Sequence, residues 1–333
     1  MHEGFTGEVR QNVKERIKKK RLRRNCKMVN ENIQIIGIDQ GWQNIKTEND
    51  CFTTAVEERC NPTFREQVLE YDGKCYVIGG KRLEVKSSKV EDEDFYLLML
   101  AGIARELKAR GNIKEASVYL AVGLPLTRFG EERADYVSYL SKNKELVFKY
   151  GDEEYHVKLL KVFVYPQCYS AVVNRIPYFE RRTVVVDIGS WTVDILPVVN
   201  KRPDETGCNS LPHGVITLVR KINKEVINGF NYEISEEDID YYIQHHKLTN
   251  APEKVIQLID RHLQEYADDI LRKLKEHSIN VELSPLVFVG GGAKIMKDYC
   301  TMVKPNMEFI LDVSANAKGY AAMTKAALRA ERR

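Results

Sequence analysis

Two distant segments of the chain share one pattern, in which a β-branched run leads into an Asp- and Gly-containing turn and a second apolar run follows. The first spans residues 33–47 and carries Asp39 and Gly41; the second spans residues 183–197 and carries Asp187. Apolar runs of this length, interrupted by glycine, predict a strand, a turn and a second strand. Because the pattern occurs twice, we expect two similar α/β domains in one chain.

The rest of the chain mixes helical and strand periodicities, which favours an α/β fold. With 333 residues, 43% of them hydrophobic, the chain is long enough for two sizeable cores. The expected hairpins lie at 67–79 and 145–160, further strands at 117–124, 162–165 and 286–289, and helices at 95–110, 131–140, 213–226, 235–246, 250–275 and 315–332.

Cysteine usage and hydropathy exclude several classes of protein. The seven cysteines are scattered and form no C-x-x-C pair, which argues against a zinc site or a disulfide framework. The apolar runs are strand-length, far below the roughly 18 to 20 residues that span a bilayer, and the N-terminus lacks a secretory apolar region. We therefore expect a cytoplasmic protein with no membrane partner.

Positive charge is concentrated at the N-terminus. Residues 1–27 hold ten Lys/Arg against three Glu, a net charge of +7; since the whole chain is +3, residues 28–333 carry −4. We expect residues 1–30 to form a disordered basic tail. It could contact DNA or anionic lipid, form a short helix used in assembly, or precede a true start at Met28.

Glycine turns after strands are typical of phosphate-binding sites. Such turns expose successive backbone N–H groups, which can hold phosphate oxygens. Asn44 and Lys46 would add donors to the first turn. A carboxylate at the strand end can hold a hydrated Mg²⁺ or orient the attacking water. A third loop, Gly290-Gly291-Gly292, follows a strand and would let a base and ribose approach the backbone. No Walker A loop is present, nor a G-x-G-x-x-G in a βαβ context.

Taken together and in this order, the three loops resemble the actin-like ATPase superfamily. Val164–Ala171 resembles its first connecting segment and Ala315–Tyr320 its second. Within the superfamily, Asp39-x-Gly-x-x-Asn-Ile-Lys46 is most similar to the ParM/StbA plasmid-segregation actins. The resemblance implies a two-domain α/β fold of the actin-like, ribonuclease H-like type with a nucleotide cleft between the domains. Domain I would comprise residues 31–180 with 314–333, and domain II residues 181–313.

The resemblance also implies a role for each site residue. Asp39 and Asp187 would hold Mg²⁺ through water, and ATP or GTP would be the nucleotide. The residues that would contact the nucleotide are Asp39, Gln40, Gly41, Asn44 and Lys46 in the first loop, Gly189, Ser190 and Thr192 in the second, Gly290, Gly291 and Gly292 in the third, Lys221 and Glu225 on the helix 213–226, and Asn316 in the second connecting segment.

Gln167 departs from the ParM pattern, which usually has Glu after the proline of the first connecting segment. Glutamine cannot act as a base, but it can orient a water molecule. With Gln167 and Asp187 as the catalytic residues, we expect slow hydrolysis coupled to assembly.

The functional expectation is a filament-forming ATPase that segregates plasmid DNA. It would assemble with itself head to tail and reach centromere-like plasmid DNA through a DNA-binding adaptor protein. Two alternatives stay open, a small-molecule kinase of the sugar-kinase type from the same superfamily and a non-filamentous, chaperone-like or regulatory ATPase. Gln167 and the lack of an inserted substrate domain favour the filament.

Overall fold

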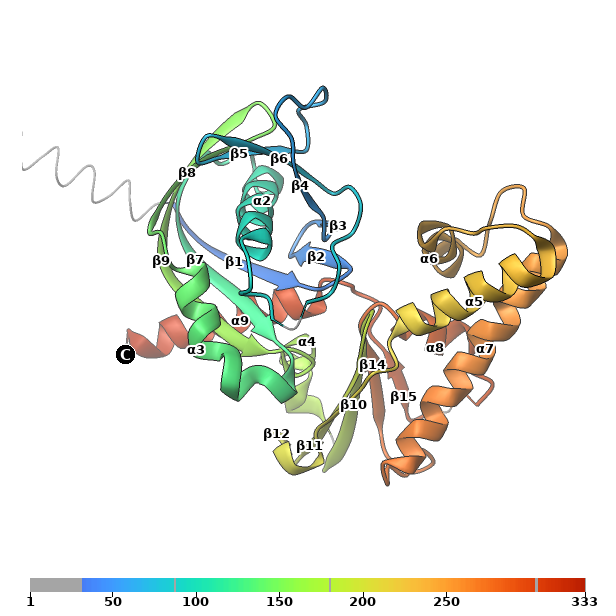
Figure 1. Ribbon diagram of the computed structural model, residues 1–333. Helices are drawn as coiled ribbons and strands as arrows, with labels where there is room; N and C mark the ends of the chain where they lie inside the picture. The colour runs from blue at the N-terminus through green and yellow to red at the C-terminus, as the bar shows by residue number, and fades with distance from the viewer. Residues whose placement is uncertain (1–31, 87, 180, 303–304, 333) are drawn as a thin grey trace, which may run out of the picture.

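Two β-sheets, each covered by helices, form the two lobes of the molecule (Figure 1). The structure is a computed structural model that describes residues 32–86, 88–179, 181–302 and 305–332. The basic segment 1–30, expected as a tail, lies outside the described residues.

The first lobe is built on a nine-stranded sheet in the order β3-β2-β1-β7-β9-β8-β5-β6-β4. Its centre, β1, β7 and β9, is parallel, and hairpins extend it on both sides. The strands are β1 (Ile33–Gln40), β2 (Asn44–Thr47), β3 (Cys51–Thr53), β4 (Val56–Glu58), β5 (Val68–Tyr71), β6 (Lys74–Ile78), β7 (Glu115–Leu124), β8 (Glu145–Tyr150) and β9 (Glu153–Pro166).

Helices cover both faces of this sheet (Figure 1). Ile36 and Ile38 of β1 share a core with α2 (Asp94–Ala109) and α3 (Phe129–Leu140). Because side chains alternate along a strand, Gly37 faces the opposite side, where α9 (Ala315–Glu331) packs. A Cβ at Gly37 would lie 2.0 Å from the carbonyl oxygen of Ala317, so this close approach requires glycine.

The second lobe is built on a smaller sheet in the order β12-β11-β10-β14-β15, with β13 paired to β11. The strands are β10 (Arg182–Ile188), β11 (Val193–Val199), β12 (Arg202–Pro203), β13 (Asn209–Leu211), β14 (Leu286–Val289) and β15 (Met307–Phe309). One face packs on α5 (Val215–Phe230), α7 (Glu253–Glu276) and α8 (Ala293–Tyr299), with α6 (Glu236–His245) beside them. The other face packs on Val172 of α4 (Tyr169–Val172), the segment that leads out of the first lobe.

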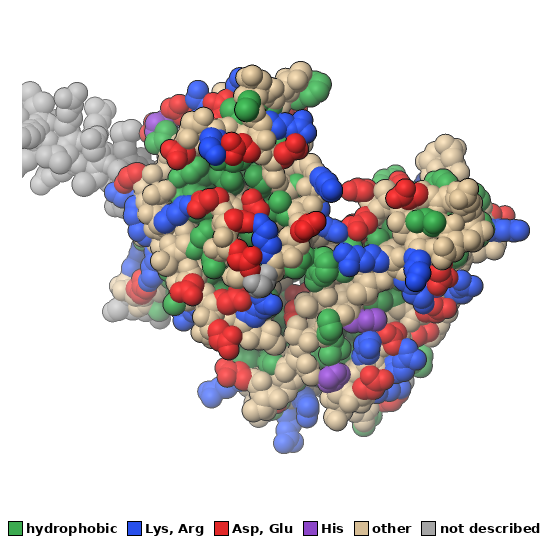
Figure 2. Space-filling model, in the orientation of Figure 1, with side chains coloured by type: hydrophobic (Ala, Val, Ile, Leu, Met, Phe, Trp, Pro, Cys, Tyr) green, Lys and Arg blue, Asp and Glu red, His purple; other side chains and the backbone are tan. Residues whose placement is uncertain are grey.

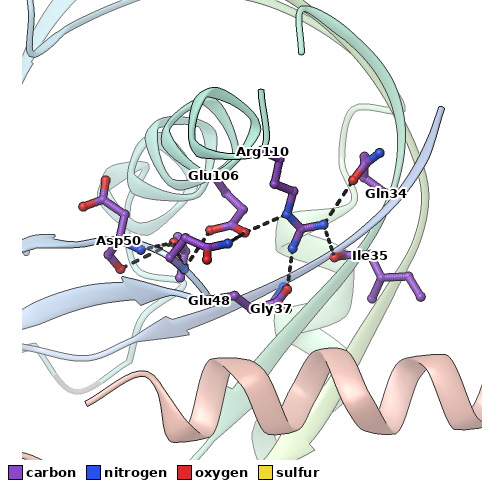
Figure 3. A network of polar contacts seen from close by, with 9 residues as sticks. Gln34, Ile35, Gly37, Glu48, Asp50, Glu106 and Arg110 are labelled. Carbon is purple, nitrogen blue, oxygen red and sulfur yellow. Dashed lines mark hydrogen bonds and ion pairs between the residues drawn. The ribbon is translucent and has the colours of Figure 1, made fainter. Parts of the chain in front are cut away.

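A buried polar network fixes β1 to the end of α2 (Figure 3). The guanidinium of Arg110 donates to Glu106 Oε1 at 2.7 Å, to Glu48 Oε1 at 2.6 Å and to the Ile35 carbonyl oxygen at 2.9 Å. Burial alone would raise the pKa of Glu106, but hydrogen bonds from Thr47, Arg110 and Asn49 outweigh burial and the pKa is lowered. The network holds the strand that carries Asp39.

Most of the expected elements form, with differences that tertiary pairing explains. The strands expected at 155–160 and 162–165 are one strand, β9, because it pairs with β8 over residues 153–158 and with β7 over residues 156–166. Helix α5 runs on to Phe230, where Asn231 takes a left-handed conformation and ends it. Within the described residues, no helix has the length and apolar character needed to cross a membrane.

Candidate functional site

A cavity of about 870 Å³ lies between the two lobes. Figure 2 shows the notch between the lobes from outside. The cavity brings together both of the repeated turns and the third glycine loop. The predicted site residues that line it are Asp39, Gly41, Asn44, Lys46, Gln167, Asp187, Gly189, Ser190, Thr192, Gly290, Gly291 and Asn316.

The two repeated turns have the same backbone geometry. Gly41 N donates to Asn44 O at 3.1 Å between β1 and β2, and Gly189 N donates to Thr192 O at 2.9 Å between β10 and β11. The second turn is also fixed to α5, because Val215 N donates to Gly189 O at 3.1 Å. Each turn therefore presents its backbone to the cavity from a rigid pair of strands.

Asp39 is the second-last residue of β1 and is held from three sides. Gln167 Nε2 donates to Asp39 Oδ1 at 2.8 Å, and Tyr320 of α9 approaches the same oxygen at 3.4 Å. Lys46 Nζ lies 3.9 Å from Asp39 Oδ2. Residue Cys168, directly after Gln167, has a φ of +66°, which is strained for a residue other than glycine. The strained turn aims the Gln167 side chain at Asp39.

Asp187 is the second-last residue of β10 and is linked to the same turn through Asn316. Asn316 Nδ2 donates to Asp187 Oδ2 at 3.1 Å, and its Oδ1 accepts from Cys168 N at 3.2 Å. Burial, with Asp194 nearby, raises the pKa of Asp187 to about 7, although the Asn316 hydrogen bond acts in the opposite direction. The amide of Asn316 therefore links Asp187 to the turn that carries Gln167, and Gln167 in turn contacts Asp39.

No three carboxylates of the described residues are placed to bind a metal ion directly, but the acidic lining could hold a magnesium ion through its water ligands. Asp39, Asp187 and Asp194 line the cavity and are all less than 9% exposed, and Lys46 forms an ion pair with Asp39. Burial raises the pKa of Asp194 as well. Mg²⁺ prefers carboxylate oxygens and usually keeps several waters. A divalent cation would offset the mutual repulsion of these carboxylates.

Gly290 is required by the packing around Asp187. Its φ is +83°, and a Cβ there would lie 2.3 Å from Asp187 Oδ1. At Gly291, by contrast, an added Cβ would have no atom of the described residues within 4 Å, so this glycine is open to the cavity that it lines. The third loop therefore offers backbone rather than side chains to a ligand.

Four predicted site residues lie outside the cavity lining. Gln40, the last residue of β1, has a buried side chain whose Nε2 donates to Phe95 O at 2.7 Å. Gly292 packs on Ile188. Lys221 pairs with Glu265 at 3.0 Å and Glu225 contacts His262 at 2.8 Å. Both are turned toward α7, because α5 buries its apolar stripe on the sheet. None of the four lines the cavity, and their contact with a nucleotide stays a prediction.

Helix α6 contributes cavity residues that the sequence analysis did not identify: Asp240, Ile243 and Gln244. Gln43 Nε2, from the first turn, donates to Asp240 Oδ2 at 2.5 Å across the cavity mouth. Arg82 and Glu236 form a second contact between the lobes at 2.7 Å. Burial raises the pKa of Asp240 to about 6. No sequence motif marks these residues as part of a site. The one sequence signal is that Asp240 and Ile243 lie three residues apart, on neighbouring positions of an amphipathic helix.

Trp42 and Trp191 line the cavity, one from each turn. The Trp42 ring meets the edge of Phe95 at 4.9 Å between centroids, and the Arg220 guanidinium lies 5.0 Å from the Trp191 ring. Both rings are thus packed at the wall of the cavity.

Family models match the two halves of the chain separately. Residues 24–169 match the model described as the actin like proteins N terminal domain. Residues 185–301 match the model described as archaeal actin homologue MreB-like, C-terminal. No curated protein matches the chain in sequence.

Solved structures share the fold over nearly their whole length. An archaeal actin homolog, Ta0583, in complex with ADP has a TM-score of 0.69 at 19% identity, over 88% of this chain and 99% of that one. The Alp12 filament structure has a TM-score of 0.65 at 18% identity, over 89% and 99%. Bacillus thuringiensis ParM with AMPPNP has a TM-score of 0.66 at 13% identity, over 89% and 99%. Identities this low establish the likeness of the fold alone.

Proposed function

We propose, because this chain is built from an actin-like N-terminal domain and an MreB-like actin C-terminal domain, that it is a nucleotide-dependent, filament-forming ATPase. In this proposal domain I comprises residues 31–180 with 314–333, and domain II residues 181–313. The nucleotide, ATP or GTP with Mg²⁺, binds in the cavity between them.

One observation carries the proposal. Asp39 and Asp187 are the second-last residues of equivalent strands in different sheets, yet both line one cavity and each is held by an amide side chain. Two similar glycine turns therefore face a shared space from opposite lobes. A triphosphate with a divalent cation is the ligand class that suits backbone donors flanked by carboxylates.

The proposed chemistry assigns a role to each residue at the centre of the cavity. Mg²⁺, when bound, supplies positive charge that stabilises the negative charge on the phosphate oxygens. Asp39 and Asp187 hold its water ligands. The backbone of the two turns, with Lys46, binds phosphate oxygens. Gly290 and Gly291 support the ribose and base.

Gln167 is proposed to orient the attacking water. Its Nε2 already donates to Asp39, and this hydrogen bond fixes the orientation of the amide. The carbonyl oxygen of the same amide can then accept a hydrogen bond from a water molecule. An amide does not take the proton, so positioning is its whole contribution, and hydrolysis is slow. Asn316 fixes the turn from which Gln167 projects.

Assembly follows from closure of the two lobes on the nucleotide. A ligand that contacts both lobes favours the closed arrangement, and a fixed arrangement presents constant surfaces for head-to-tail stacking. The likeness to the Alp12 filament structure supports self-association. Segregation of plasmid DNA through a DNA-binding adaptor is the physiological output that we propose for such a filament.

The test is to follow light scattering and pelleting of the purified chain with Mg-ATP, Mg-GTP, Mg-ADP or no nucleotide, together with phosphate release. We expect triphosphate-dependent filaments in electron micrographs, followed by phosphate release, and neither with Asp187→Ala. Phosphate release without assembly would favour the chaperone-like or regulatory ATPase. Turnover that requires an added sugar or other acceptor would favour the kinase.

A further inference from the structure

Among the described residues, one lysine on the cavity wall forms no ion pair. Lys89 lies in the segment between β6 and α2, lines the cavity and is 6% exposed. The other cations of the lining each form an ion pair: Lys46 with Asp39, Lys86 with Asp92 and Asp94, and Arg128 with Glu132. Lys89 forms none with any residue that the structure describes.

The surroundings of the Lys89 ammonium satisfy only part of its hydrogen-bonding capacity. Nζ donates to the carbonyl oxygen of Gln40 at 2.5 Å and lies 5.5 Å from the centroid of the Phe95 ring. An ammonium has three donors, and in the described part of the chain this carbonyl is its one hydrogen-bond acceptor. Burial lowers the pKa of Lys89 to about 8, although Asp39 and Glu132 act in the opposite direction.

Lys89 lies at the end of the cavity that is formed by the first turn. Gln40, whose carbonyl it contacts, lies between Asp39 and Gly41, and both of these residues line the cavity. The neighbouring lining residues Thr127 and Arg128 also come from the first lobe. The apolar lining residues Val215, Ile243 and Ile295 belong to the second lobe, where a base would be accommodated. Lys89 is thus placed at the phosphate end.

A desolvated cation without a counter-ion is unfavourable unless an anion completes the site. The other cations that line this wall are already paired with carboxylates. The anion that the proposed function brings to this end of the cavity is the terminal phosphate of the nucleotide or, after hydrolysis, the released phosphate.

We infer that Lys89 is a binding residue for the terminal phosphate group, which its ammonium contacts before hydrolysis and retains as inorganic phosphate afterwards. This inference rests on the proposed function and adds a residue that distinguishes the triphosphate from the diphosphate. Lys46 and the glycine turns bind phosphate oxygens in either nucleotide, whereas Lys89 would act only when the third phosphate is present.

The test compares the affinities of wild type, Lys89→Gln and Lys89→Arg for Mg-AMPPNP and Mg-ADP by calorimetry. Lys86→Gln is the matched control, since Lys86 lies in the same segment and cavity wall but is paired with Asp92 and Asp94. We expect Lys89→Gln to weaken AMPPNP binding by about tenfold or more and to change ADP binding by less than about twofold, as expected for one charge-assisted contact. Lys89→Arg should recover part of the preference, and Lys86→Gln should keep it.

Equal losses for both nucleotides, or no loss for either, would overturn the inference. Thermal unfolding without nucleotide distinguishes a binding role of Lys89 from a structural one. Because the substitution removes a buried cation that forms no ion pair, a binding role leaves the melting temperature of Lys89→Gln equal to that of wild type or higher. A lower melting temperature would show that Lys89 holds the segment in place. A second arm titrates inorganic phosphate into the Mg-ADP complex, where stabilisation by phosphate should be present in wild type and absent in Lys89→Gln. If wild type binds neither nucleotide, it is the proposed function that fails.

Discussion

Gln167 Nε2 donates a hydrogen bond to Asp39 Oδ1 at 2.8 Å, which ties the end of β9 to the end of β1 at the centre of the cavity. We expect Gln167→Ala to slow phosphate release by about tenfold to a hundredfold, because water positioning is lost while the binding residues remain. Nucleotide-dependent assembly should persist and give longer-lived filaments. Phosphate release and pelleting on the same sample measure both. If assembly is lost as well, Gln167 has a structural role.

Asn316→Ala should lower turnover by about tenfold while changing nucleotide affinity far less. The substitution removes the acceptor of Cys168 N and the donor to Asp187, so the turn that carries Gln167 loses its link to the second lobe. Single-turnover phosphate release, compared with AMPPNP affinity, separates the two effects. Lys325→Ala on the same helix is the control, since Lys325 is exposed and lies outside the cavity lining. A large loss of affinity with unchanged turnover would contradict this role.

Asp187→Asn should abolish hydrolysis and stabilise the nucleotide-free protein. Burial raises the pKa of Asp187 to about 7, so the folded state favours the protonated form. An unfolded Asp titrates near 4. The contribution of this group to the free energy of unfolding therefore falls as pH rises from about 4 to 7, and above pH 7 it is destabilising by on the order of 4 kcal/mol. Urea unfolding at pH 6 and pH 8 should show a pH difference in wild type that is smaller in Asp187→Asn. Identical pH differences would argue against the shift.

Breaking the contacts across the cavity mouth should speed nucleotide release. Arg82 pairs with Glu236 at 2.7 Å, and both side chains are partly exposed, so the pair contributes about 0.2 to 1 kcal/mol. We expect Arg82→Ala to raise the dissociation rate of a fluorescent nucleotide by about 1.5- to 5-fold, and less at high salt. Glu236→Ala and the double variant complete a mutant cycle. Additive effects would show that the pair does not hold the lobes together.

Arg110→Ala should destabilise the first lobe, although Arg110 is not one of the residues that line the cavity. Glu106 is fully buried and Glu48 partly so, and both would lose their cation. Breaking a buried pair in this way costs about 3 kcal/mol. Since the pKa of Glu106 is lowered in the folded state, its stabilising effect in wild type is present above its unfolded pKa and is lost as pH falls below it. Urea unfolding at neutral and at acid pH tests this, and a loss that is the same at both would count against the assignment.

The sequence by itself determined the elements and the turns at the ends of the strands. The β-branched runs that end at Asp39 and Asp187 form β1 and β10, because apolar periodicity and glycine act locally along the chain. The amphipathic spacing of 95–110 and 250–275 predicted α2 and α7 to within a few residues. Family resemblance, carried by five short motifs, indicated the actin-like fold, and the family models and the shared fold of solved structures confirm it.

Only the tertiary structure decided which side chains reach the cavity. Gln40 follows Asp39 directly, yet the alternation of a strand turns it to the buried face, where it contacts Phe95. Lys221 and Glu225 are turned toward α7, while Asp240 and Gln244 of α6 and the buried Lys89 take places on the wall. These outcomes depend on packing between elements far apart in the sequence, and local patterns carry no information about which partner a helix face will meet.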